Sequence, residues 1–209
     1  MSSESIAGAI LAGGRSSRMG GGDKAFAALA GKPLLAHLIE RVQPQVQALA
    51  LCVATASRDI EAFGLQQLTD PLPGHQGPLG GLLSALRRFS ASHHWLLLAP
   101  CDAPFLPLNL AARLRECAAI AGAPCAAVVY EGELQPTFSI WHPAVLQPLE
   151  QAVGQAGLAG FKQFMRLIKT AELNWPAAEP PPFFNVNDPA ALEQANDWIR
   201  QDARLAQAC

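Results

Sequence analysis

The 209-residue sequence has little of what marks several large classes of protein. It carries 15 Lys and Arg against 17 Asp and Glu, a formal charge of −2, so it lacks the basic excess of nucleic-acid-binding proteins. It has no apolar stretch near the roughly 20 residues that a membrane-spanning helix needs. Its first eleven residues lack the basic region of a secretory signal. We therefore expect a cytoplasmic protein without nucleic-acid or membrane partners.

Cysteine is scarce, and the sequence lacks several familiar catalytic motifs. The five cysteines include no C-x-x-C pair of the kind that binds zinc or exchanges disulfides. We interpret them as reduced thiols, and the apolar surroundings of Cys52, Cys101 and Cys125 favour core positions. The G-x-x-x-x-G-K-[ST] loop of P-loop GTPases is missing. No convincing Ser-His-Asp or Cys-His arrangement is present either.

What the sequence does have is an alternation of strand and helix patterns, with half of its residues hydrophobic. Three short apolar runs predict strands, Ile6–Leu11, Ala48–Ala54 and Trp95–Ala99, the last of them buried, and Leu65–Thr69 is interpreted as a further strand. Apolar residues at helical spacing predict helices in three further segments: Pro33–Val46, Pro78–Phe89 and Pro107–Ala121. Strands that alternate with helices predict an α/β fold with a mostly parallel sheet covered on both faces.

The second half of the chain follows a different pattern. Two apolar runs, Ala126–Tyr130 and Gln135–Ile140, flank the turn residues Glu131-Gly132-Glu133 and predict an antiparallel pair late in the sheet. The segments after them predict two helices, a strand and a proline-rich loop: Pro143–Ala152, Gly160–Ile168, Thr170–Asn174 and Pro176–Pro182. A final helix should run to about Leu205, with Asp188 as its N-cap and Pro189 as its first residue.

A loop rich in glycine and positive charge follows the first predicted strand. Residues 11–24 hold five glycines and three cations, Arg15, Arg18 and Lys24. Glycine lets backbone N–H groups approach phosphate oxygens, and the cations add the charge that a triphosphate needs. Ligands bind at the carboxyl ends of strands in such sheets. The competing interpretation is a flexible surface loop with solvated basic side chains.

Two aspartates also follow predicted strands. Asp102 comes soon after Trp95–Ala99, and Asp70 comes directly after Thr69. Because Mg²⁺ is commonly held by one or two carboxylates together with phosphate oxygens, Asp102 is our choice of metal ligand. A nucleotide contact is our interpretation of Asp70. Either residue could instead begin a turn before the proline that follows it.

Six motifs along nearly the whole chain resemble those of the molybdenum cofactor guanylyltransferases, a family within a wider group of nucleotidyltransferases. The motifs are LAGGRSSRMGGGDK (Leu11–Lys24), GKPLL (Gly31–Leu35), TDPLPGHQGPLGGL (Thr69–Leu82), PCDAPFL (Pro100–Leu106), QPTFSIW (Gln135–Trp141) and FFNVNDP (Phe183–Pro189). The resemblance implies a three-layer Rossmann-like fold and the transfer of GMP from GTP to the terminal phosphate of molybdopterin. It implies one domain over residues 1–209, with a nucleotide-binding half (1–105) and an acceptor-binding half (106–209).

The same resemblance implies a set of site residues. Nucleotide contacts are implied for Leu11, Ala12, Gly13, Gly14, Arg15, Lys24, Thr55, Asp70, Gly77, Pro78, Leu79, Gly80 and Asp102. Thr55 stands where the family often has asparagine. The glycine-rich segment from Gly77 is on the guanine side in the family, although close packing at a helix start explains it equally well. Asn185 and Asn187 resemble a late motif near the acceptor and the metal, and turn or capping chemistry is their alternative.

The implied chemistry needs no catalytic base, because the second pKa of the acceptor phosphate is roughly 6 and this group is already largely anionic near neutral pH. We expect Asp102 to hold Mg²⁺, Lys24 and Arg18 to stabilise the departing pyrophosphate, and the N–H groups of Gly13 and Gly14 to hold the phosphates in register.

Several alternatives stay open at this stage. The same chemistry could use CTP, as in a molybdopterin cytidylyltransferase, or another phosphate acceptor. A non-catalytic module that binds GTP or molybdopterin is a different class, and the presence of both the loop cations and Asp102 argues against it. We expect a monomer, with transient contacts to molybdenum insertion proteins or recipient molybdoenzymes. Lys162, Arg166 and Trp175 could each be core, surface or ligand contacts, and packing is the favoured interpretation of Trp175.

Overall fold

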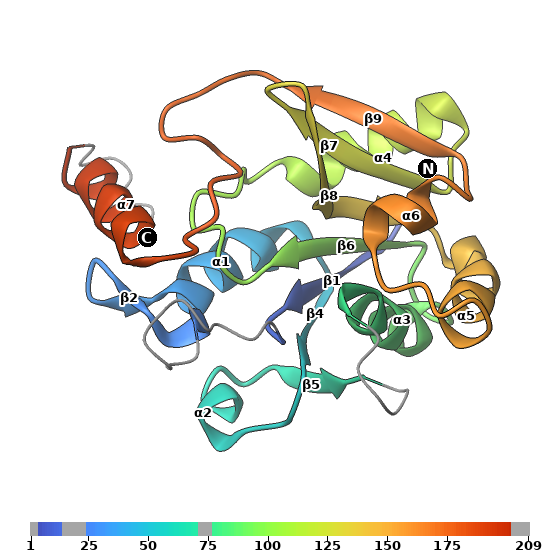
Figure 1. Ribbon diagram of the computed structural model, residues 1–209, viewed down its shortest axis with the longest axis horizontal. Helices are drawn as coiled ribbons and strands as arrows, with labels where there is room; N and C mark the ends of the chain where they lie inside the picture. Colours follow the sequence, from blue (N-terminus) through green and yellow to red (C-terminus); the bar gives the residue numbers. More distant parts are fainter. Residues whose placement is uncertain (1–3, 14–23, 71–76, 202–209) are drawn as a thin grey trace.

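The computed structural model describes residues 4–13, 24–70 and 77–201. A seven-stranded sheet in the order β5-β4-β1-β6-β8-β7-β9 forms its centre, with helices on both faces (Figure 1). The strands of this sheet are β1 (Ile6–Leu11), β4 (Ala48–Val53), β5 (Gln66–Thr69), β6 (Trp95–Pro100), β7 (Cys125–Tyr130), β8 (Glu133–Trp141) and β9 (Thr170–Trp175). Each lies within two residues of a predicted strand at both ends.

The strand directions follow the prediction. β1 is parallel to β4 and β6, β4 is parallel to β5, and β7 is parallel to β9. β8 runs antiparallel to both of its neighbours, β6 and β7. The predicted α/β fold, with a mostly parallel sheet and a late antiparallel pair, is confirmed.

Helices cover the two faces of the sheet because side chains alternate along each strand. On β1, Ile6 and Ile10 join a core that includes α1 (Leu34–Val42) and α4 (Leu110–Ala121). Ala7 and Ala9 face a second core, which is built from α3 (Pro78–Phe89), α5 (Leu146–Gly154) and α6 (Phe161–Met165). The molecule therefore has three layers, helix, sheet and helix (Figure 1).

A C-terminal helix lies outside these layers. Helix α7 (Pro189–Gln201) packs beside a small hairpin formed by β2 (Ala28–Leu29) and β3 (Lys32–Pro33) (Figure 1). Six buried residues form the apolar cluster at this contact: Leu29, Leu34, Phe105, Val186, Ala195 and Ile199. The cluster joins the start, the middle and the end of the described chain.

Several predicted helix boundaries were wrong. Helix α1 ends at Val42 and continues as a 3-10 turn over Gln43–Gln45, because Pro44 has no N–H for the next α-helical hydrogen bond. Helix α4 begins at Leu110 rather than Pro107, and α6 covers only Phe161–Met165 of the longer predicted segment. The Asp188 cap is confirmed, since its Oδ1 accepts a hydrogen bond of 2.8 Å from Ala191 N. The predicted end near Leu205 lies outside the described residues.

Within residues 4–13, 24–70 and 77–201, no helix is both long and apolar enough to cross a membrane. Cys52 and Cys125 are buried as predicted, and burial raises the pKa of the Cys52 thiol to about 12. Cys101 is only half-buried, because it lies at the end of β6 where the chain leaves the sheet.

Candidate functional site

The carboxyl ends of β1 and β6 lie side by side at one edge of the sheet. Cys101 N donates a hydrogen bond of 3.0 Å to Leu11 O, and Ala12 N donates one of 2.8 Å to Cys52 O on β4. These bonds continue the parallel ladder just past the ends of the strands. The carboxyl ends of β4, β1 and β6 therefore form a continuous edge, which is where an open α/β sheet binds ligands.

Gly13 is held against the chain that leaves β4. A Cβ at this position would lie 2.9 Å from Ala54 N, closer than such atoms approach in real structures. The sequence therefore needs glycine here for packing as well as for any approach to phosphate. Thr55, the predicted nucleotide contact, is exposed close to this point. Gly14, Arg15 and Arg18, which the sequence also placed in this site, lie outside the described residues.

The central feature of the edge is a cluster of three polar side chains from distant parts of the chain. The Lys24 ammonium forms an ion pair with Asp102 Oδ2 and donates a hydrogen bond to Asn187 Oδ1. The side chains of Lys24 and Asp102 are 13% and 14% exposed, so the pair is largely shielded from water and still reachable. The structure thus brings together three residues that the sequence had placed in the site through three separate motifs.

Oxygen atoms with unused hydrogen-bonding capacity surround this cluster. Asp102 Oδ1 and Asn185 Oδ1 are buried and have no hydrogen-bond partner among the residues that the structure describes. The chain around Asn185 is fixed beside Asp102, since Val186 N donates a hydrogen bond of 2.9 Å to Asp102 O. Carboxylate and amide oxygens suit Mg²⁺, which keeps several of its waters and takes few protein ligands. The residues present therefore fit a magnesium ion held largely by phosphate and water.

A larger metal cage is not part of this arrangement. Among the described residues, no group of three or more His, Cys, Asp or Glu side chains is placed to hold a metal ion. A structural zinc site, for example, needs four such ligands. The donor set instead agrees with the sparse protein ligation that is usual where a metal binds together with a nucleotide.

A second group of predicted residues lies at the start of α3. Gly77 is the N-cap, with φ of +63°, a conformation that favours glycine. Gly80 lies directly against Asp70, because a Cβ on Gly80 would be 2.1 Å from Asp70 Oδ2. Leu79 is fully buried, whereas Pro78 is exposed. A carboxylate against the first turn of a helix is favoured by the helix dipole.

Leu11 connects the two groups. A Cβ on Gly81 would lie 2.7 Å from Leu11 Cδ2, so α3 packs directly on the end of β1. The Lys24–Asp102 cluster and the Asp70–Gly80 contact therefore lie along one edge, on opposite sides of β1 in the strand order.

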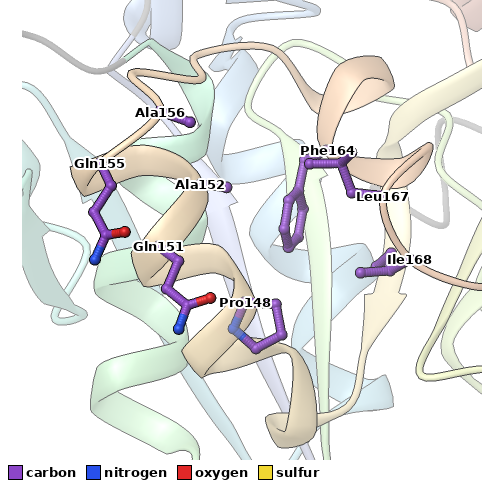
Figure 2. A pocket seen from close by; sticks show the side chains of 8 residues that line it. All are labelled: Pro148, Gln151, Ala152, Gln155, Ala156, Phe164, Leu167 and Ile168. Carbon is purple, nitrogen blue, oxygen red and sulfur yellow. The ribbon is translucent and has the colours of Figure 1, made fainter.

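Two other features do not belong to this edge. A hollow of about 450 Å³ lies between α5 and α6 (Figure 2), and its lining contains no charged side chain, so it does not suit a phosphate. Trp175 is covered by the Arg113 guanidinium, 3.9 Å from the ring centroid, and packs edge-on against Phe183. These contacts favour the packing interpretation of Trp175.

One contact behind Lys24 was not predicted. Asn196 on α7 accepts a hydrogen bond of 2.9 Å from Ala30 N at the tip of the β2–β3 hairpin, which follows Lys24 closely in the chain. Ala30 has φ of +49°, which is rare for a residue with a side chain. Two-residue strands have too few positions to show a period, so only the Ala30-Gly31 turn could have indicated this hairpin.

Comparison with known proteins decides the family. Residues 8–172 match the family described as MobA-like NTP transferase domain. The chain belongs to this family. It is 34% identical over 198 residues to a molybdenum cofactor guanylyltransferase of Rhodopseudomonas palustris, covering 93% of this chain and 94% of the relative. It is 38% identical over 198 residues to a guanylyltransferase of the same name from Rhizobium meliloti, with 91% and 90% covered.

Solved structures agree with this membership at the level of the fold. Molybdopterin-guanine dinucleotide biosynthesis protein A from Archaeoglobus fulgidus superposes with a TM-score of 0.77 at 21% identity, covering 94% of this chain and all of that one. CMP:2-keto-3-deoxy-manno-octonic acid synthetase complexed with CTP superposes with a TM-score of 0.71 at 16% identity, covering 94% and 99%. The MobA-like chain therefore shares its fold with a protein of molybdopterin-guanine dinucleotide biosynthesis and with a synthetase whose structure holds CTP.

Proposed function

We propose that this chain transfers GMP from GTP to the terminal phosphate of molybdopterin, forming molybdopterin guanine dinucleotide and pyrophosphate in a magnesium-dependent reaction. The observation that carries the proposal is the cluster of Lys24, Asp102 and Asn187 at the carboxyl edge of the sheet. The curated relatives named molybdenum cofactor guanylyltransferase, which match almost the whole chain, supply the choice of GTP and molybdopterin.

In this reaction a phosphate oxygen of the acceptor attacks the α-phosphorus of GTP, the bond to the β-phosphate oxygen breaks, and pyrophosphate leaves. The attacking group is already anionic near neutral pH, so the site needs no general base. Its task is to hold two anions in line and to neutralise the charge that develops on the leaving group.

The chain's own residues divide this task. The Lys24 ammonium would stabilise the negative charge that develops on the leaving pyrophosphate. Asn187 Oδ1 accepts a hydrogen bond from this ammonium and so orients it. The backbone around Gly13 lies at the end of β1, where N–H groups can hold the phosphates. Asp70, in contact with Gly80, would bind the nucleoside part beside the start of α3.

Magnesium, when bound with the nucleotide, supplies positive charge to the phosphate oxygens. Asp102 and Asn185 are the residues that would hold it, because each has a buried side-chain oxygen with no other partner. Lys24 pairs with Asp102 Oδ2, which leaves Oδ1 as the oxygen that would face the metal ion.

The first test is pyrophosphate release from the purified protein with molybdopterin, supplying GTP, CTP and ATP in separate reactions, with and without Mg²⁺. Release with GTP and Mg²⁺ alone is the expected result. A preference for CTP would keep the chemistry and overturn the choice of nucleotide. Binding of GTP without any turnover would instead support a non-catalytic binding module.

Substitutions at the cluster test the assigned roles. Asp102→Asn and Lys24→Met should each lower kcat by about 100-fold or more, the usual effect of removing a group that stabilises charge in a transition state. Asp197→Asn is the matched control, because Asp197 forms a fully exposed ion pair with Arg200 on α7. Near wild-type turnover in either cluster variant would remove the basis for these roles.

A further inference from the structure

The motif QPTFSIW forms an irregularity in β8. Ala127 on β7 pairs with Ser139, yet the next residue, Val128, pairs with Gln135. Pro136, Thr137 and Phe138 are therefore left without partners on β7 and form a bulge. Bulges of this kind are common beside active sites, where they change the direction of side chains.

The bulge coincides with a split in the sheet beside Asp102. β8 pairs with β6 only through Leu96, Leu97 and Leu98. Ala99 and Pro100 continue to pair with β1, but they have no partner on β8. β8 thus leaves β6 at Ser139, where the bulge begins, and β6 continues toward Asp102 paired with β1 only.

The shape of the bulge is set by specific interactions. Ser139 is fully buried, and its hydroxyl donates a hydrogen bond of 2.8 Å to Pro136 O and accepts one of 2.8 Å from Trp141 Nε1. Pro136 has no N–H to offer a neighbouring strand, which suits a position where pairing is interrupted. The bulge is therefore a built part of the strand.

The same segment is tied to the residues around Lys24 and Asp102. The Phe138 ring packs against Phe183, with 4.8 Å between the ring centroids. Phe183 begins the segment that carries Asn185 and Asn187, and Val186 N bonds to Asp102 O. Packing therefore holds the bulge and the polar cluster in a fixed relation.

Two polar side chains lie at the bulge, Gln135 just before it and Thr137 within it. Gln135 and Thr137 are half-buried, and neither side chain takes part in a hydrogen bond within the described residues. The predicted nucleotide contacts on β1, β5 and α3 lie on the other side of β6 in the strand order. The β8 side is the part of the edge left for the second substrate.

We propose that Gln135 and Thr137 bind the acceptor, with the Gln135 carboxamide on the polar edge of its pterin ring and the Thr137 hydroxyl on a neighbouring acceptor oxygen. This proposal rests on the proposed function. A carboxamide presents a donor and an acceptor side by side, which matches the donor and acceptor pattern of an amide-like ring edge. Both side chains are neutral, so they would bind the acceptor without adding charge to the site. The Lys24 ammonium already supplies positive charge there.

The test compares Gln135→Met and Thr137→Val with Thr137→Ser, which keeps the hydroxyl, and with Glu133→Gln, an exposed residue on the same strand. Steady-state rates give KM for molybdopterin and for GTP, and quenching of pterin fluorescence gives direct binding of molybdopterin whether or not turnover occurs. Circular dichroism and the thermal midpoint check that each variant folds. A lost neutral hydrogen bond predicts a KM and a Kd for molybdopterin about 3- to 10-fold higher.

The GTP constants should not change in any variant, and Thr137→Ser and Glu133→Gln should bind molybdopterin like the wild type. Equal molybdopterin binding in all folded variants would overturn the proposal while leaving the proposed function standing. A wild-type protein that binds molybdopterin but produces no dinucleotide would contradict the proposed function. In that case the fluorescence titration of the variants would still show whether Gln135 and Thr137 bind the pterin. An equal rise in the GTP constant would assign these side chains to the nucleotide and also overturn the proposal.

Discussion

Among the glycines that the structure describes, Gly80 has the least room for a side chain, and that makes it a sensitive test of Asp70. Alanine there should favour the helix by about 1 kcal/mol, yet its Cβ would be 2.1 Å from Asp70 Oδ2 and must displace the carboxylate. Gly80→Ala should therefore weaken GTP binding by about 10-fold, a change of about 1.4 kcal/mol, without lowering the thermal midpoint. Calorimetric titration with GTP measures this. Gly154→Ala is the control, since nothing lies within 4 Å of its added Cβ; unchanged binding in Gly80→Ala would argue against a nucleotide role for Asp70.

His37, also a single buried residue, predicts how stability depends on pH. Burial lowers the pKa of its imidazole, and its Nε2 forms a hydrogen bond of 2.8 Å with Leu29 O. In the unfolded chain the imidazole takes up a proton near pH 6.5, whereas in the folded chain it does so only at lower pH. The neutral, buried imidazole therefore contributes fully to the free energy of unfolding above about pH 6.5, and this contribution falls as the pH drops below that value. Urea unfolding at pH 8 and pH 5 should show a smaller loss for His37→Gln than for the wild type. Equal losses would show that the imidazole does not titrate differently in the two states.

At the scale of elements, α7 links the segments that carry the site. Trp198 packs edge-on against Phe105 and Phe184, with ring centroids 5.8 Å and 4.9 Å away. Phe105 follows Asp102 closely, and Phe184 precedes Asn185 and Asn187. Trp198→Ala should cost about 2 kcal/mol of unfolding free energy, less than a fully buried tryptophan, and should also lower kcat because Asn187 loses its support. Urea unfolding and steady-state rates measure the two effects. Arg200→Ala, on the exposed side of α7, should change neither, and a stability loss without a change in kcat would show that α7 does not position the site.

Most helices and strands could be predicted from the sequence, because each is long enough to show its characteristic pattern of apolar residues. Strands β1, β4 and β6 show continuous apolar runs, and Pro78 marks the start of α3 at the correct residue. The β2–β3 hairpin and the bulge in β8 could not be predicted, because neither contains a repeat, and both depend on contacts with residues far away in the chain. Lys24 and Asp102 could be chosen from local context, whereas their ion pair with each other depends on the register of the whole sheet.

On the scale of the whole molecule, a nucleotide that binds the folded chain should stabilise it. GTP with Mg²⁺ at about 100 times its Kd would add about 2.7 kcal/mol, which for a chain of this size raises the thermal midpoint by about 5–10 °C. Differential scanning fluorimetry with GTP, with Mg²⁺ and with both measures this. The part of the shift that requires Mg²⁺ should be lost in Asp102→Asn and kept in Asp197→Asn. A full shift in Asp102→Asn would mean that Asp102 does not hold the metal.

The contact between Lys24 and Asn187 also has a consequence for how the protein is made. The two residues are 163 positions apart, so the ribosome completes the β1 loop, β6 and Asp102 long before it supplies Asn187 and α7. During that interval the nascent chain can form the β1–β6 part of its sheet, but it lacks the segment that orients Lys24. Translation therefore separates the synthesis of the central strands from the assembly of the Lys24–Asp102–Asn187 cluster, which needs the last part of the chain.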